Sequence, residues 1–245
     1  ITSPLRQSVT QYHQIVLQDI ERGLALPLYR SEVYLYGLDW SPDGESIYFG
    51  SRHDDRFYSD LAVLDIATGE MRWLTDSADT DDVHPSVSPD GVRLVFQYFE
   101  SGQTGWDIML YDLASGDTQM LYQGISADTS PDWSSDGRFI AFETASVGRN
   151  SANVMVYDLQ TETTTRLTTG MDGTPSWTPD GDLLFTSQQG NHFDVYRMDA
   201  HGDNRRRLTT TPFGSFDAIA HPDGERVVYV SWADVGASRR AAQLF

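Results

Sequence analysis

The sequence predicts an all-β fold: a β-propeller whose blades are four-stranded antiparallel sheets. Three observations support this prediction. A turn motif recurs at intervals of 43 to 47 residues, an apolar run follows each copy, and a second marker containing Asp lies further along four of the repeats. Self-similarity at this period is typical of architectures in which each repeat is one supersecondary unit.

The turn motif has the form Ser-Pro-Asp-Gly, with substitutions in three copies. Pro presets φ for the first corner, Asp accepts hydrogen bonds from nearby backbone N–H groups, and Gly adopts the positive φ that closes the turn. We therefore expect each copy to form the hairpin turn between the first and second strands of a blade. The five copies are 41–44, 88–91, 134–137, 178–181 and 221–224.

The segments between the turns supply the other strands. Apolar and aromatic runs such as Ile47-Tyr48-Phe49 follow the turns and indicate buried second strands. The third strand ends in an Asp that can bind the N–H groups of the next turn, which favours a structural role for Asp65, Asp112, Asp158 and Asp199. A Leu-Thr or Leu-Tyr pair closes the fourth strand. The tryptophans expected to pack between blades are Trp40, Trp133 and Trp177.

These repeats define the expected domain organisation, a single propeller over residues 1–245. Four complete blades span 36–81, 82–127, 128–171 and 172–214, and partial blades at the two ends span 1–35 and 215–245. This pattern predicts a ring of six blades with incomplete terminal blades. Five blades are the alternative, if the two partial blades merge into one, and a longer parent chain also fits the pattern.

Charge excludes several classes of partner. The chain has 17 basic residues, all of them Arg, against 36 acidic residues, which gives a formal net charge of -19. Such a surface repels nucleic acid and anionic membranes, and it favours cations and basic proteins. No run is long and apolar enough to span a bilayer, so no direct membrane insertion is expected. The chain has no Cys and therefore no disulfide.

The motifs together resemble a known repeat. The repeat begins with a Trp and the turn motif, as in Trp40–Gly44 and Trp133–Gly137. A Phe-containing strand follows, then a strand ending in an Asp-containing tripeptide such as Tyr157-Asp158-Leu159, and then a Leu-Thr or Leu-Tyr pair. This pattern resembles the WD40-like (PD40) repeat of the TolB-like propeller family. The resemblance covers the chain from about Gln14 onward. It implies an extracytoplasmic location in a bacterium, either periplasmic or at the cell surface or beyond. The repeat also resembles the blades of tricorn and prolyl oligopeptidase family propellers, so the fold alone does not define function.

The sequence contains no familiar catalytic motif. Gly-x-Ser-x-Gly, Gly-x-Gly-x-x-Gly, His-Glu-x-x-His and the Walker loop are all missing. We therefore expect a non-catalytic module for protein interaction or scaffolding, with one or more protein partners. Two alternatives remain open: the substrate-gating propeller of a larger prolyl-oligopeptidase-like or tricorn-like peptidase, and a metal-dependent sugar-active enzyme working at the propeller face.

One candidate binding site follows from the register of the repeats. Asp82, Asp128 and Asp172 each stand six residues before the residue that opens a turn motif, so they occupy equivalent positions in successive blades. The segment enters the innermost strand, and the three carboxylates are therefore expected to form a ring at the mouth of the central channel. Converging carboxylates repel one another, and a hard cation or a bound water would relieve this repulsion, so a divalent cation such as Ca²⁺ is the only candidate cofactor. The alternative is that these Asp residues cap local turns.

Several other polar residues are of types that can bind a ligand or an ion. His84 joins the candidate binding residues, whereas His53 and His192 are interpreted as solvated loop residues. The acidic run of Asp76, Asp79, Asp81 and Asp82 suits either a hard cation or a solvated loop. The run 205–207, three consecutive Arg residues, is interpreted as charge that protects an outer sheet edge.

Overall fold

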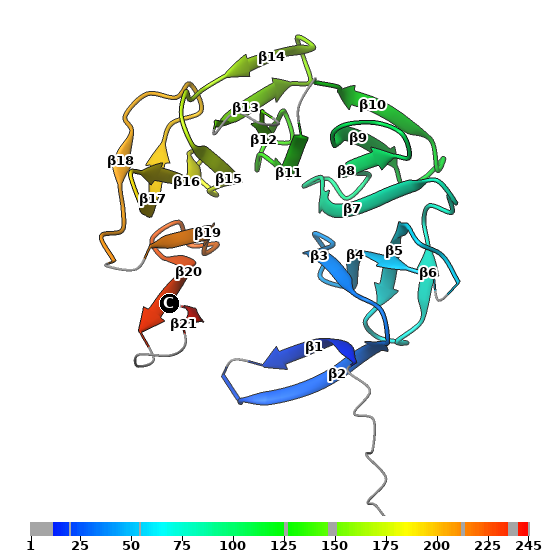
Figure 1. Ribbon diagram of the computed structural model, residues 1–245. Helices are drawn as coiled ribbons and strands as arrows, with labels where there is room; N and C mark the ends of the chain where they lie inside the picture. The colour runs from blue at the N-terminus through cyan, green and yellow to red at the C-terminus, as the bar shows by residue number, and fades with distance from the viewer. Residues whose placement is uncertain are drawn as a thin grey trace, which may run out of the picture.

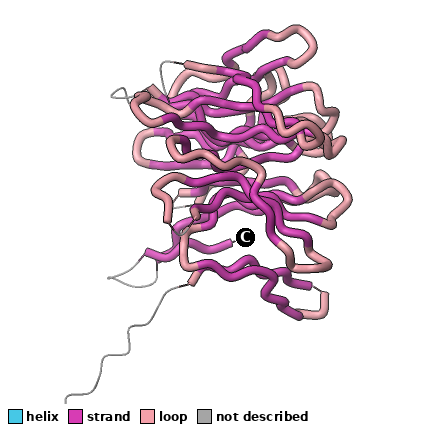
Figure 2. The backbone as a smooth tube through the Cα atoms, turned by 90° about the vertical axis from the view of Figure 1, so that its right-hand side faces the viewer, coloured by secondary structure: helices cyan, strands magenta, loops and turns pink. Residues whose placement is uncertain are grey.

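Every regular element that the structure describes is a β-strand. The computed structural model describes residues 12–19, 21–53, 55–124, 127–146, 151–211, 214–234 and 240–244. Strands and loops alone make up these segments, as Figure 2 shows. The described residues accordingly contain no helix that could cross a membrane. The predicted all-β class is confirmed.

Four antiparallel sheets contain four strands each, paired in chain order. The first sheet contains β3 (Leu35–Trp40), β4 (Ser46–Arg52), β5 (Ser59–Asp65) and β6 (Met71–Trp73). The second contains β7 (Thr80–Val87), β8 (Arg93–Glu100), β9 (Asp107–Asp112) and β10 (Thr118–Tyr122). The third contains β11 (Ala127–Trp133), β12 (Phe139–Ala145), β13 (Ala152–Asp158) and β14 (Thr163–Arg166). The fourth contains β15 (Asp172–Trp177), β16 (Leu183–Gln189), β17 (His192–Met198) and β18 (Arg206–Arg207).

Two smaller sheets come from the ends of the chain. One is the pair β1 (His13–Asp19) and β2 (Leu24–Ser31), and the other contains β19 (Ser215–Ala220), β20 (Val227–Asp234) and β21 (Arg240–Leu244). Figure 1 shows the six sheets around a common centre, with β3, β7, β11, β15 and β19 nearest to it and β6, β10, β14 and β18 at the periphery. This arrangement of the described residues fits the six-blade prediction.

The turn motif joins the first and second strands of each blade, as predicted. In the turn between β11 and β12, the Ser134 hydroxyl donates to Asp136 Oδ1 at 2.6 Å and accepts the N–H of Phe139 at 2.8 Å. Gly137 has φ of 70°, a conformation that costs glycine little. Arg138 then donates two hydrogen bonds to Asp158, at 3.1 and 2.7 Å, which ties this turn to the end of the third strand. The turn thus fixes the register of three strands.

Adjacent blades are joined by apolar packing and by hydrogen bonds between inner strands. Trp133 is 5% exposed, packs with residues of β8, β9 and β12, and donates its indole N–H to the Ser86 carbonyl at 3.1 Å. Asp39 Oδ2 accepts the N–H of Val87 in the next blade at 2.7 Å, and Asp132 Oδ2 accepts that of Trp177 at 2.6 Å. A side chain of one inner strand therefore satisfies the backbone of the next.

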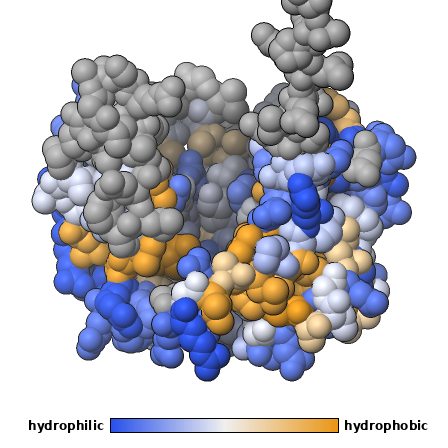
Figure 3. Space-filling view, turned by 90° about the horizontal axis from the view of Figure 1, so that it is seen from below, coloured by the Kyte–Doolittle hydropathy of each residue, from blue (hydrophilic) through white to orange (hydrophobic). Residues whose placement is uncertain are grey.

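Trp40 departs from its prediction. It occupies the position of Trp133 and Trp177, yet it is 49% exposed whereas they are 5% and 8% exposed. At Trp133 and Trp177, residues of the second and third strands of the preceding sheet pack against the indole ring, but the sheet before Trp40 contains only β1 and β2. Val228 on β20 is likewise 42% exposed. Figure 3, which views the molecule from the side of β1 and β2, shows hydrophobic surface on this side.

This contrast predicts unequal effects of two identical truncations. Trp133→Ala is expected to lower the free energy of unfolding by about 3–5 kcal/mol, because it empties a packed junction and leaves the Ser86 carbonyl unpaired. Trp40→Ala is expected to cost less than about 1 kcal/mol, because the residue is half exposed. Urea titrations followed by circular dichroism would measure both values. Equal losses would show that Trp40 is packed as tightly as Trp133.

Candidate functional site: a pocket between three blades

The three predicted ring carboxylates lie at equivalent positions near the beginning of inner strands β7, β11 and β15. Asp82, Asp128 and Asp172 are all buried, with exposed fractions of 4%, 0% and 2%. Their three environments differ in the charges that surround the carboxylate.

Asp82 lies in an acidic and largely dry environment. The pKa of its carboxyl is raised to about 7, chiefly by burial and in part by the neighbouring Asp60 and Asp81, while the side chains of Thr75 and Thr80 oppose the increase. Its Oδ1 is buried without a hydrogen-bond partner among the described residues. The protonated form is therefore favoured over much of the range in which a free Asp is ionised.

Asp128 has a similar but weaker shift. Its Oδ2 accepts the N–H of Gly124 at 3.0 Å, a contact that caps the connection entering β11. Burial raises the pKa to about 6, and the nearby Asp107 contributes in the same direction. The turn-capping interpretation, which was the alternative to the ion ring, matches the Gly124 contact.

Asp172 already has a cationic partner. Arg205 donates to Oδ1 at 3.1 Å and to Oδ2 at 3.2 Å, and it also donates to the Ser187 hydroxyl at 2.7 Å. The guanidinium lies 4.7 Å from the ring centroid of Tyr196. The arginine run that was predicted to protect a sheet edge thus also neutralises a buried carboxylate, as Arg207 does for Asp194 at 2.7 Å.

The structure brings a different set of potential metal ligands together. In the segments that the structure describes, the one group of three such side chains is His53, Asp60 and Asp76, whose ligand atoms lie within 4.8 Å of one another. Arg56 forms ion pairs with both of these carboxylates, and the His53 ring stacks on Trp73 at 3.8 Å. His53 is therefore part of a stacked ion-pair cluster rather than a solvated loop residue. Cation binding by Asp82, Asp128 and Asp172 stays a prediction.

The inner strands share an irregularity that shapes the channel side of the ring. Each contains a β-bulge, two residues after the position of the predicted ring Asp, at which the register shifts and φ is positive. A positive φ is unusual for residues other than glycine, and a bulge re-aims the side chain it carries. The bulge residues are Gly37, His84, Ser130, Thr174 and Asp217, with φ of 52°, 51°, 55°, 46° and 52°.

His84, the fourth candidate binding residue, is the bulge residue of β7. Its side chain is exposed, and its ring centroid lies 6.4 Å from that of Tyr36. Neighbouring bulges approach closely, because a Cβ at Gly37 would collide with the backbone of His84. Glycine at position 37 is therefore required by the space available, since the other bulges adopt the same φ with larger residues.

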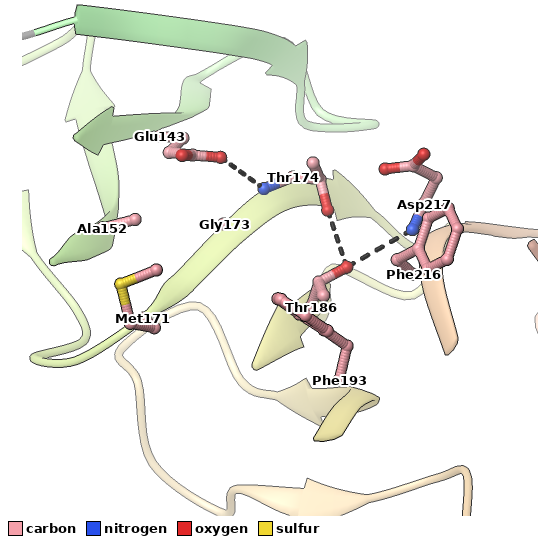
Figure 4. Close-up of a pocket in the computed structure, with 9 residues that line it drawn as sticks. All are labelled: Glu143, Ala152, Met171, Gly173, Thr174, Thr186, Phe193, Phe216 and Asp217. Atoms are coloured by element: carbon pink, nitrogen blue, oxygen red, sulfur yellow. Dashed lines mark hydrogen bonds between the residues drawn. The ribbon is translucent and has the colours of Figure 1, made fainter. Parts of the chain in front are cut away.

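Two of the bulges border a pocket of about 340 Å³. Figure 4 shows its lining, which comes from β12, β13, β15, β16, β17, β19 and the connection before β15. The polar lining consists of Glu143, Thr174, Thr186 and Asp217, and the apolar lining of Ala152, Met171, Phe193 and Phe216. These residues lie near the beginning of inner strands and near the loops between second and third strands. The pocket is therefore at the end of the ring opposite the Ser-Pro-Asp-Gly turns.

A chain of hydrogen bonds crosses the polar wall (Figure 4). Glu143 Oε2 accepts the N–H of Thr174 at 3.0 Å, the hydroxyls of Thr174 and Thr186 are 2.7 Å apart, and Thr186 Oγ1 accepts the N–H of Asp217 at 3.3 Å. Gly173 permits this arrangement, because a Cβ there would collide with the Glu143 carboxylate. Three neighbouring blades thus hold the two carboxylates of the pocket in place.

Both pocket carboxyls are disfavoured as anions. Burial raises the pKa of Glu143, the Thr174 N–H opposes this, and the charge of Asp217 adds to the increase. Burial also raises the pKa of Asp217, which the Thr174 side chain partly offsets. Asp172 and Arg205 line a second pocket, of about 640 Å³, which shares Met171 with the first. The sequence predictions missed both pockets, although Glu143 was visible as an acid directly after the second-strand Phe142.

Comparison with known families decides the classification of this fold. The family model of the TolB β-propeller domain matches residues 5–151, more than half of the chain. The chain belongs to the TolB β-propeller family. No curated protein matches it by sequence.

Solved structures similar to this TolB-type propeller agree on the fold. TolB from Acinetobacter baumannii superposes with a TM-score of 0.78 at 21% identity, over 94% of this chain and 56% of that one. The putative TolB from Agrobacterium tumefaciens gives 0.72 at 20% identity, over 93% and 82%. An oligogalacturonate lyase in complex with manganese gives 0.65 at 19% identity, over 92% and 67%. The chain spans little more than half of the Acinetobacter protein, and identities this low show the fold alone.

The buried carboxyls predict that the stability of this TolB-type propeller falls as pH rises. Asp82 and Asp132 have pKa values raised to about 7 and Asp128 to about 6, against 3.8 in the unfolded chain. The folded state therefore binds more protons between pH 4 and 7, so the free energy of unfolding decreases across this window, by up to about 1.4 kcal/mol per pH unit for each carboxyl. Urea titrations from pH 4.5 to 8 would measure the slope.

Two variants separate this effect from general acid sensitivity. At pH 8, Asp128→Asn is expected to stabilise the protein by about 1–3 kcal/mol and to flatten the slope, because it removes a charge that burial disfavours. Asp172→Asn is expected to destabilise it by about 1–3 kcal/mol, because Arg205 loses its partner. A stability that rises between pH 5 and 7, or the same sign for both variants, would contradict the assignment.

Proposed function

We propose that this chain is a non-catalytic binding module that holds a segment of a partner protein at the pocket-bearing end of its ring. The observation that carries the proposal is the pocket itself. Three blades contribute to it, and it combines apolar walls with a few positioned polar groups, the usual composition of a ligand site. Phe193 on its apolar wall is 38% exposed and available to a partner.

The chemistry of the pocket favours binding over catalysis. Its two hydroxyls, those of Thr174 and Thr186, are bonded to each other, and the described lining of the pocket contains no His or Lys beside them. One oxygen of Glu143 is committed to the Thr174 N–H. These polar groups are therefore better suited to orienting a ligand than to attacking it.

The proposal includes the kind of partner and its location. A net charge of -19 supports a basic protein partner rather than nucleic acid or an anionic membrane. Membership of the TolB propeller family supports a location outside the cytoplasm of a bacterium. The gating propeller of a larger peptidase and a metal-dependent sugar-active enzyme are the competing functions.

Selection from a random peptide display library tests the proposal. The purified protein is expected to enrich peptides that bind in the micromolar range, since a small interface of this kind supports modest affinity. Phe193→Ala should weaken the selected peptides at least tenfold in calorimetric titration. Val92→Ala, a change at an exposed residue of the turn between β7 and β8 at the opposite end, should leave affinity unchanged.

Three results would count against the proposal. The first is failure to enrich any peptide, and the second is equal sensitivity of the selected peptides to the two alanine variants. The third is stoichiometric hydrolysis of peptides, or metal-dependent cleavage of acidic oligosaccharides, that survives repurification. That result would favour one of the competing enzyme functions.

A further inference from the structure

Three blades present an acceptor to the bulge of the next blade, but only one uses a charged group. In β8, Gln97 Oε1 accepts the N–H of Ser130 at 3.2 Å. In β12, Glu143 accepts the N–H of Thr174 at 3.0 Å. The Thr186 hydroxyl plays the same part in β16, at 3.3 Å. An amide or a hydroxyl therefore satisfies this contact, and the fold does not require a carboxylate at position 143.

The same comparison applies to Asp217. It occupies a bulge position that in other inner strands holds an uncharged residue or a histidine, namely Gly37, His84, Ser130 or Thr174. Among the described residues, no Arg or His forms an ion pair with Glu143 or Asp217. Two carboxylates that the fold does not require, one on the half-buried Glu143 and one on the exposed Asp217, thus face one pocket.

The rest of the pocket restricts the ligand that would use these carboxylates. Met171, Phe193 and Phe216 form apolar walls beside them, so a cation carried on an apolar stem would be complementary at both ends. A partly buried carboxylate such as that of Glu143 binds a cation more strongly than a fully solvated one when the geometry permits hydrogen bonds, and the exposed Asp217 adds a second negative charge. A volume of about 340 Å³ is at the lower end for ligand sites and suits one side chain rather than a folded element.

We propose that the pocket binds an arginine or lysine side chain projecting from the partner segment, with its cationic head between Glu143 and Asp217 and its stem against Phe193. This inference rests on the proposed function, because it names the chemistry that the partner supplies. The strongly acidic chain attracts such a segment, and the two carboxylates select the side chain that enters.

Small probes test the site without a known partner. Nα-acetyl-arginine amide and its neutral isostere Nα-acetyl-citrulline amide would be titrated into the ¹⁵N-labelled protein and followed by NMR. Nα-acetyl-lysine amide and Nα-acetyl-norleucine amide form a second pair. We expect the charged member of at least one pair to bind at least tenfold more tightly than its neutral counterpart and to shift the amide signals of Thr174 and Asp217.

Charge-removing variants locate the effect. Glu143→Gln is expected to fold, because Gln97 performs the same structural role in the neighbouring blade, and to weaken binding of the cationic probe at least tenfold. Asp217→Asn should also weaken it. Glu70→Gln, the same change on the exposed turn between β5 and β6, should leave binding unchanged. Equal affinity for the charged and neutral members of both pairs, or unchanged binding by both pocket variants, would overturn the inference.

The outcomes separate this inference from the proposed function. One outcome would overturn the inference but support the proposed binding function. In it, the display-selected peptides depend on Phe193, lack basic residues and bind the Glu143→Gln protein as well as the parent. Cationic probes that bind at the pocket of a protein that enriches no peptide would overturn the proposed function and support the site.

Discussion

The ring depends on backbone N–H groups at the β-bulges of β11, β15 and β19, which form hydrogen bonds across the blade junctions. At Ser130, Thr174 and Asp217 the N–H points to the second strand of the preceding blade, where a side chain accepts it. An unsatisfied N–H in this position would cost about 1–3 kcal/mol, so the contact has to form. It fixes how far one blade is rotated relative to the next, and with it the packing of residues such as Trp133 at the blade junctions.

This contact fixes the position of the acceptor atom but not the type of residue that supplies it. A binding site can therefore arise in one repeat without disturbing the fold. Any acceptor of suitable length satisfies the N–H, so the residue at this position is free to vary between blades. Glutamate at position 143 meets the structural need and adds a charge, at a cost in burial that the glutamine at position 97 does not incur. The pocket therefore occurs where two variable positions, 143 and 217, lie on the two blades that flank the fourth sheet.

Local chemistry explains which features could be predicted from the sequence. The five turns and the strands that they join follow from residues within a few positions of one another, such as Ser134, Asp136 and Gly137, and these predictions are confirmed. Contacts between blades depend on residues 31 to 48 positions apart and were predicted less well. The repeat spacing correctly placed Asp82, Asp128 and Asp172 at equivalent backbone positions. It could not predict that Arg205 forms an ion pair with Asp172 and so gives this residue a different environment. Burial of Trp40 failed as a prediction because it depends on a neighbouring sheet rather than on the residue itself.

The buried carboxyls also make folding a reaction that takes up protons. Because Asp82, Asp128 and Asp132 hold protons in the folded state at a pH where the unfolded chain has released them, folding near pH 5.5 is accompanied by net proton uptake. Unfolding returns those protons to the solvent, and the heat absorbed during melting then includes the heat of protonating the buffer. The apparent enthalpy of unfolding of this propeller is consequently a property of the protein and its buffer together, and it differs between phosphate and an amine buffer although the structure is the same.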